Sequence, residues 1–151
     1  MAGQSSMEYR EILRPPLQTL AFIYFLLGSI VIAIWAALPA PATQISFILS
    51  LLLLLLIARS LSSKIILAND VLYVGKAAIE TKFIAEVILL DKKEMALERT
   101  VRIDPAAHLS LKFWEPKGVK IILQDERDPT PYWLVTTKRG EELKSAILQR
   151  S

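Results

Sequence analysis

The sequence predicts a membrane-embedded helical hairpin followed by a small α+β domain. From Pro15 to Ala58 the chain has no Asp, Glu, Lys, Arg or His, as is typical of segments whose solvent is lipid. Residues 60–151 instead carry 15 Lys and Arg against 13 Asp and Glu, an ordinary soluble composition. Short alternating apolar runs fill this second part. We therefore divide the chain into an N-terminal segment (1–16), a two-helix hairpin (17–59) and a β-rich domain (60–151).

The hairpin contains two apolar segments, 17–38 and 42–59. As a helix the first is about 33 Å long, enough to cross the hydrocarbon layer. Pro39 and Pro41 end it because neither can donate a backbone hydrogen bond. The second segment is about 25 Å long between residues 42 and 58, at the low end for a span. A re-entrant or interfacial second segment, or cleavage of a signal peptide near residue 41, are the alternatives.

Positive charges predict the orientation of the hairpin. Arg10 and Arg14 precede the first apolar segment, Arg59 and Lys64 end or follow the second, and the connecting loop has no cation. By the positive-inside rule, both termini face the cytoplasm. The expected location is the cell membrane, as a multi-pass protein.

Extended runs separated by turn residues predict the β-rich domain. Asn69 and Asp70 tolerate the positive φ of a two-residue hairpin turn. Lys92–Thr100 is the only interior helical candidate, and Glu141–Gln149 forms a C-terminal amphipathic helix. The expected strands are 64–68, 71–75, 78–84, 86–90, 109–114, 119–123 and 132–137. About seven antiparallel strands and a closing helix favour a pleckstrin-homology-like barrel or sheet, with ferredoxin-like and other α+β sandwiches as alternatives.

Several segments resemble a known family. The chain has Tyr9-Arg10-Glu11 before the first apolar segment, Leu72-Tyr73-Val74-Gly75 in a strand hairpin, and Asp128-Pro129-Thr130-Pro131-Tyr132-Trp133 followed by Lys138-Arg139. In these motifs it is similar to small, uncharacterised two-span membrane proteins of actinobacteria, a family defined by a domain of unknown function. A Gly follows Arg139 where a Pro is more usual. The resemblance implies a membrane location and this architecture, and it supplies no activity.

Composition argues against several kinds of chemistry. The chain has no Cys and one His, His108, which is too few ligands for a zinc site. Asp125, Glu126 and Asp128 cluster, but without the spacing of a calcium loop. The net charge of +3 comes without a clustered basic face, which argues against nucleic-acid binding. We expect no enzyme activity and no cofactor.

Two surfaces are candidates for binding. The first, proposed to bind a protein partner, consists of Asp128, Thr130, Pro131, Tyr132 and Trp133, although aromatic residues that begin a strand are more often core. The second, proposed to contact lipid headgroups, consists of Arg59, Lys64, Lys76 and Lys82. The preferred hypothesis is a non-enzymatic scaffold that presents the β-rich domain to a membrane or envelope-associated protein. The alternative is recognition of anionic lipid headgroups, and a homo-oligomer is compatible with either.

Overall fold

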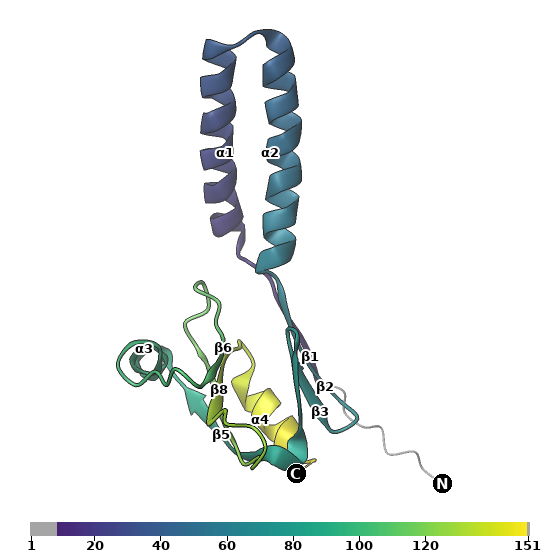
Figure 1. The fold of residues 1–151 in the computed structure, drawn as a ribbon, viewed down its shortest axis with the longest axis vertical. Helices are drawn as coiled ribbons and strands as arrows, with labels where there is room; N and C mark the ends of the chain where they lie inside the picture. Colours follow the sequence, from purple (N-terminus) through teal and green to yellow (C-terminus); the bar gives the residue numbers. More distant parts are fainter. Residues whose placement is uncertain (1–8, 151) are drawn as a thin grey trace. The chain divides into compact units, whose positions relative to one another are not determined.

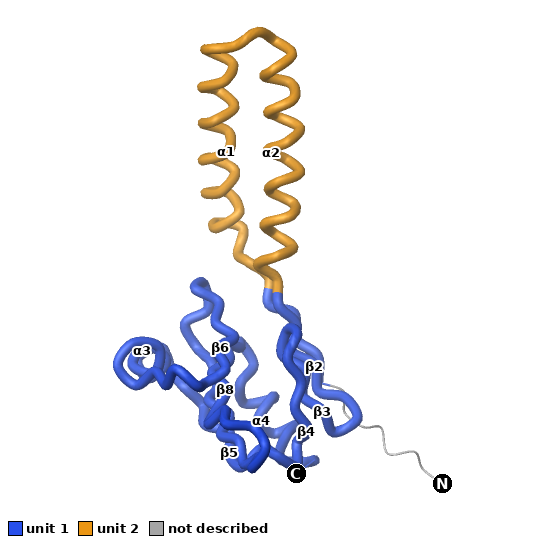
Figure 2. Tube along the Cα trace, in the orientation of Figure 1, with its two compact units in different colours: residues 1–13, 63–151 blue, residues 14–62 orange. Residues whose placement is uncertain are grey.

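The computed structural model describes residues 9–150 and divides into two compact units. One unit contains the two long helices, residues 14–62, and the other contains the described residues up to Leu13 and from Ser63 onwards (Figure 2). The N-terminal strand therefore belongs to the sheet-rich unit, although residues 1–16 were expected to form a separate segment.

The helical unit consists of α1, Leu17–Ala37, and α2, Ala40–Leu61, which lie side by side (Figure 1). Both are long and apolar enough to cross a membrane by length and composition. The bounds of α1 match the sequence prediction closely. Helix α2 is longer than predicted, because Pro41 lies in its first turn, where a missing N–H costs nothing, and because it continues beyond Arg59. Its full length is about 33 Å, the same as that expected for α1.

The first sheet is an antiparallel meander of β1 (Tyr9–Leu13), β2 (Ser63–Ala68), β3 (Val71–Val74) and β4 (Ala77–Glu80), in that order. Strand β1 was not predicted. It pairs with β2 from Tyr9↔Leu67 to Leu13↔Ser63, so the helical unit is inserted between two hydrogen-bonded strands. Only residues 14–16 and Ser62 connect these strands to the helices.

The turn between β2 and β3 confirms the role predicted for Asn69 and Asp70. Their φ angles are 50° and 59°, and the flanking residues Ala68 and Val71 are directly paired. Both central residues of such a turn must adopt positive φ, which Asn and Asp tolerate.

The second sheet consists of β5 (Ile84–Leu90), β7 (Gly118–Leu123), β8 (Tyr132–Thr136) and β6 (His108–Ser110), in that spatial order. A 3-10 turn, Thr81–Phe83, separates it from β4, where an unbroken extended run was expected. The prediction of antiparallel strands was wrong for β6, which runs parallel to β8. The segment that contains α3 (Lys92–Thr100) carries the chain from β5 at one edge of this sheet to β6 at the other edge. The expected strand 109–114 is also shorter, because the chain leaves the sheet after Ser110.

One main core joins both sheets to the C-terminal helix α4, Gly140–Leu148. Leu143 and Ile147 of α4 are fully buried, and the helix packs against β5 and β1. A smaller cluster of Leu90, Met95, Tyr132 and Leu134 fills the opposite face of the second sheet under α3. The structure therefore confirms two long apolar helices and a sheet-rich domain with a C-terminal helix, and its two sheets are open.

Candidate functional site

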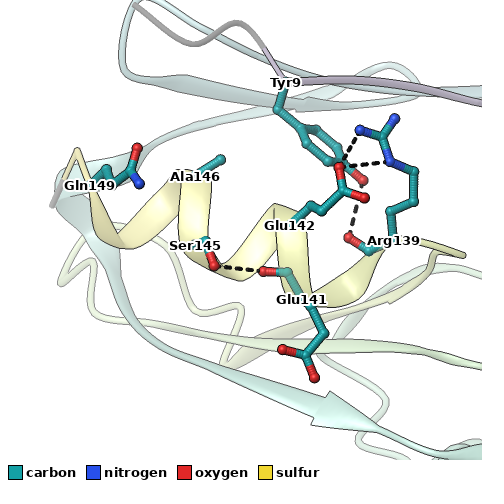
Figure 3. Close-up of a pocket in the computed structure, with 7 residues that line it drawn as sticks. All are labelled: Tyr9, Arg139, Glu141, Glu142, Ser145, Ala146 and Gln149. Atoms are coloured by element: carbon teal, nitrogen blue, oxygen red, sulfur yellow. Dashed lines mark hydrogen bonds and ion pairs between the residues drawn. The ribbon is translucent and has the colours of Figure 1, made fainter.

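A groove of about 400 Å³ lies between β1 and α4 (Figure 3). Its lining combines one aromatic ring, an ion pair, polar side chains and a small apolar residue: Tyr9, Arg139, Glu141, Glu142, Ser145, Ala146 and Gln149. Tyr9 comes from the strand that precedes α1, and the other residues come from the first to the last turn of α4 and the residues flanking it. The groove is thus lined by residues from near both ends of the described chain.

Arg139 is held over the face of Tyr9. Its guanidinium carbon lies 5.2 Å from the centre of the phenol ring, and its Nε donates to Glu142 Oε2 at 2.9 Å (Figure 3). A second guanidinium nitrogen, Nη2, also pairs with this carboxylate. The ion pair raises the pKa of Arg139 and lowers the pKa of Glu142. The charges are therefore fixed in place at neutral pH, and the Tyr9 ring is covered on one face.

A buried carboxylate, Glu11, supports the groove. Its Oε2 accepts hydrogen bonds from the Tyr9 hydroxyl at 2.8 Å and from Thr137 Oγ1, and its Oε1 accepts from the backbone N–H of Lys138 at 2.9 Å. Glu11 is only 6% exposed. It therefore fixes β1 to the segment between β8 and α4.

Two features of the sequence pointed to parts of this site. Tyr9, Glu11 and Leu13 alternate with exposed residues, the period of a half-buried strand. The segments Tyr9-Arg10-Glu11 and Lys138-Arg139 were singled out for their resemblance, and the structure brings them together. Their proximity was not foreseen, because β1 was not predicted.

The arrangement is suited to binding. Glu141, Ser145 and Gln149 offer acceptors and donors at the rim, while Ala146 leaves space at the floor. Burial raises the pKa of Tyr9 above its ordinary value, so that its hydroxyl remains a donor to Glu11. Tyr and Arg are also the side chains most enriched at the centres of protein interfaces.

The raised pKa of Tyr9 predicts a loss of stability in alkali. The folded state retains the phenol proton more strongly than the unfolded state, whose tyrosine pKa is about 10. The contribution of Tyr9 is therefore complete below about pH 10 and decreases as the pH rises above it. We expect Tyr9→Phe to be less stable at neutral pH and to lose less stability between about pH 9 and 11. Thermal unfolding of both proteins across this range measures the difference, and parallel curves would contradict it.

The predicted partner-binding segment is only partly at the surface. Tyr132 and Trp133 are buried, at 7% and 5% exposure. The Tyr132 hydroxyl accepts from the Asp104 N–H at 3.0 Å and donates to the Arg102 carbonyl at 3.3 Å. The centre of the Trp133 ring lies 4.8 Å from that of His108. Both rings therefore pack inward, as is usual for aromatic residues that begin a strand, because β8 is covered on both faces.

The other residues of that segment form a stiff turn. Asp128 is exposed, while Thr130 and Pro131 are partly buried. The Thr130 N–H donates to Asp128 Oδ1 at 2.9 Å, and hydrogen bonds from Thr130 hold the pKa of Asp128 below its ordinary value. Asp128 and Trp133 also line a second hollow of about 380 Å³, together with Glu80, Phe83 and Asp125 among others.

The predicted headgroup-binding cations are divided by the sheet topology. Lys64 and Lys76 lie at the end of the first sheet from which the chain continues to the helices, since Gly75 N–H donates to the Lys64 carbonyl. Arg59 lies in the last turn of α2. Lys82 follows β4 at the opposite end of the sheet and pairs with Glu80 at 2.5 Å. Within the sheet-rich unit, Lys82 is therefore separated from Lys64 and Lys76.

The fold and the groove together define a class: a chain with two long apolar helices inserted into a two-sheet domain that has a surface groove. The chain belongs to the family described as "Protein of unknown function (DUF3093)", which matches residues 8–147. No curated protein and no solved structure matches the chain.

Proposed function

We propose that the chain is a multi-pass protein of the cell membrane, that α1 and α2 span the bilayer, and that both termini face the cytoplasm. The placement of cations supports this orientation. Arg14 lies before α1, Arg59 lies in the last turn of α2, and the two-residue loop between the helices has no charge. The similar lengths of the helices, 21 and 22 residues, favour two full spans over a re-entrant segment.

We propose a pleckstrin-homology-like fold for the sheet-rich unit, and its strand order supports this. Its first four strands form a meander, its strands β5, β7 and β8 form a second one, and a C-terminal helix follows. The crossover with α3 and β6 is then an insertion between the first two strands of the second meander. In this proposal α4 closes the space between two open sheets.

The proposed activity is non-enzymatic recognition of a protein partner at the β1–α4 groove. The single observation that carries it is the groove itself, with its Tyr9–Arg139 stack, small floor and polar rim. A partner side chain that enters above Ala146 would lie between the Gln149 amide and the Arg139–Glu142 ion pair (Figure 3). This groove takes the place of the Asp128–Trp133 segment as the proposed partner site, because the aromatic rings of that segment are buried.

Strand β1, which forms one wall of the groove, lies next to the proposed spans in the chain. Three residues separate β1 from α1, and one residue separates α2 from β2. These short connections keep the sheet-rich unit within a few residues of both proposed spans. A partner bound at the groove would therefore be held close to the membrane. No cofactor takes part in this function.

Photo-crosslinking in intact cells tests the groove. A photoreactive residue at Ser145, which is exposed at the rim, should yield a reproducible protein adduct identified by mass spectrometry. The matched control carries the same probe at Glu86, an exposed residue of β5 outside the groove. Adding Ala146→Trp, which fills the floor, should abolish the Ser145 adduct while the protein remains folded. Persistence of the adduct in the filled variant, or identical adducts from both probe positions, would contradict the proposal.

A further inference from the structure

Large apolar side chains are exposed unevenly on the sheet-rich unit. Among its described residues, five of the eight lie between residues 97 and 113: Leu97, Val101, Ile103, Leu109 and Phe113. Val101 and Phe113 are the most exposed, at 77% and 70%. Exposed apolar side chains that gather in one region mark a surface that is covered in use. We call the part formed by α3 and the loop around Phe113 the α3 surface.

The α3 surface has a hollow of about 300 Å³. Phe113 and Pro116 border it on the loop side, and Lys92, Ala96, Arg99 and Thr100 border it on the helix side. Phe113 also packs edge-on against Trp114, with ring centres 4.8 Å apart. An exposed aromatic ring thus lies beside two cations on one rigid helix.

The acidic side chains of this region are engaged within the protein. Asp91 and Glu94 form the capping box of α3, and Glu98 is buried and pairs with Lys120 at 2.8 Å. Arg99 is different: its Nη2 donates to the Glu115 carbonyl at 2.9 Å, while its buried Nε has no acceptor among the described residues. Asp91 and Glu94 remain exposed carboxylates beside Lys92, so the net charge of the α3 surface depends on the further cations around Phe113.

Other basic side chains extend the positive charge around Phe113. Lys93 and Lys117 are exposed, and Lys112 lies over the face of Trp114 with its Nζ 5.8 Å from the ring centre. Arg102 is largely exposed and only loosely paired with Glu98, at 3.7 Å. Apolar side chains with cations interspersed are the composition of surfaces that lie in the interface of an anionic bilayer.

We infer that the α3 surface contacts an anionic lipid surface, with Phe113 in the interfacial layer and with Lys92 and Arg99 at lipid phosphates. The inference rests on the proposal that α1 and α2 span the membrane. Spanning helices would hold this domain near lipid at all times, so a weak attraction is enough to keep it in contact. Charge complementarity favours lipid over a protein partner, because the exposed cations of residues 91–117 outnumber the exposed carboxylates and the cytoplasmic leaflet is negative. The exposed cations are Lys92, Lys93, Arg102 and Lys117, and the exposed carboxylates are Asp91 and Glu94.

The absence of Cys from the chain permits a clean test with single labelled cysteines. The full chain is placed in nanodiscs of zwitterionic lipid, with or without anionic lipid. An environment-sensitive fluorophore is attached at Phe113→Cys, and quenching by nitroxide lipids reports its depth. Leu148→Cys on α4, at 58% exposure, is the matched control. We expect quenching at residue 113 that is several-fold stronger in anionic discs, and little quenching at residue 148.

Three further variants separate the possible outcomes. Ile32→Cys in α1 should be quenched in both lipids; if it is not, the spans themselves are wrong. If residue 32 is quenched and residue 113 is not, the lipid contact is wrong and the spans stand. Lys92→Gln should reduce the contact about fivefold, while Lys138→Gln should not. Equal quenching at residue 113 in both lipids, or its loss on adding inorganic phosphate at constant ionic strength, would overturn the recognition of anionic lipid.

Discussion

Replacement of Glu11 by Ala is expected to destabilise the sheet-rich unit by about 3 kcal/mol, because three donors lose this acceptor. The Thr137 hydroxyl and the backbone N–H of Lys138 lose their carboxylate partner, and the Tyr9 hydroxyl keeps only a long hydrogen bond to the Arg139 carbonyl, at 3.4 Å. Thr137 is 1% exposed, so water cannot readily replace the carboxylate there. The loss is large against the 5–15 kcal/mol total stability of a typical domain.

The same change should loosen β1 before the rest of the unit. Strand β1 is an edge strand that pairs only with β2 in the first sheet, and Glu11 connects it to the end of β8. Amide exchange in β1 should accelerate more than exchange in β7, and thermal unfolding should occur at a lower temperature. Glu141→Ala, an exposed acidic residue at the groove rim, is the matched control and should leave both unchanged. Uniform acceleration across all strands would show that Glu11 has no special role in holding β1.

Glu11→Ala should also weaken the proposed partner binding, because Glu11 holds one wall of the groove in place. If β1 detaches, Tyr9 no longer stacks with Arg139, and the proposed site loses one wall. The crosslink from Ser145 should then be lost in Glu11→Ala. The groove-filling variant should lose it without a loss of stability. The two variants together distinguish a folding effect from a binding effect.

Much of the fold follows from local sequence patterns. The charge-free stretch up to Ala58 predicts both long helices, since an apolar stretch of this length depends on no distant partner. The bounds of α3 were predicted as observed, and the structure shows that a capping box of Asp91 and Glu94 fixes its start. Asn69 and Asp70 likewise encode their turn locally.

The missed features depend on partners that are distant in sequence. Strand β1 is too short to be recognised alone, and its partner β2 begins 50 residues after it ends. Strand β6 has only three residues, and its direction depends on how the chain returns to the sheet after α3. The groove needs both β1 and α4. Tyr9 and Arg139 belong to motifs noted in the sequence, but their proximity could not be predicted without β1. For Tyr132 and Trp133, burial depended on which faces of β8 were covered.

Among the described glycines of the sheet-rich unit, replacement by Ala is expected to be most destabilising at Gly118. A Cβ at this position would lie 2.3 Å from the Val135 carbonyl oxygen and 2.6 Å from Met95 Cε. The methionine side chain can move, but the carbonyl belongs to β8, which pairs with β7 at Val119↔Val135. The backbone must therefore separate at the start of β7, and overpacking of this kind costs about 3 kcal/mol.

Gly140→Ala is the matched control for this prediction, because its Cβ would meet only side chains, with Leu89 Cδ2 and Val119 Cγ1 both at 3.2 Å. These side chains can shift by a few tenths of an ångström, so the change in stability should stay within about 1 kcal/mol. Amide exchange and thermal unfolding of the full chain measure both variants. In Gly118→Ala, exchange should accelerate first where β7 and β8 pair next to α3. Because Met95 of α3 also contacts this position, contact between lipid and Phe113 should weaken in the same variant. Equal effects of the two substitutions would show that the close approach at Gly118 is not what constrains the sheet.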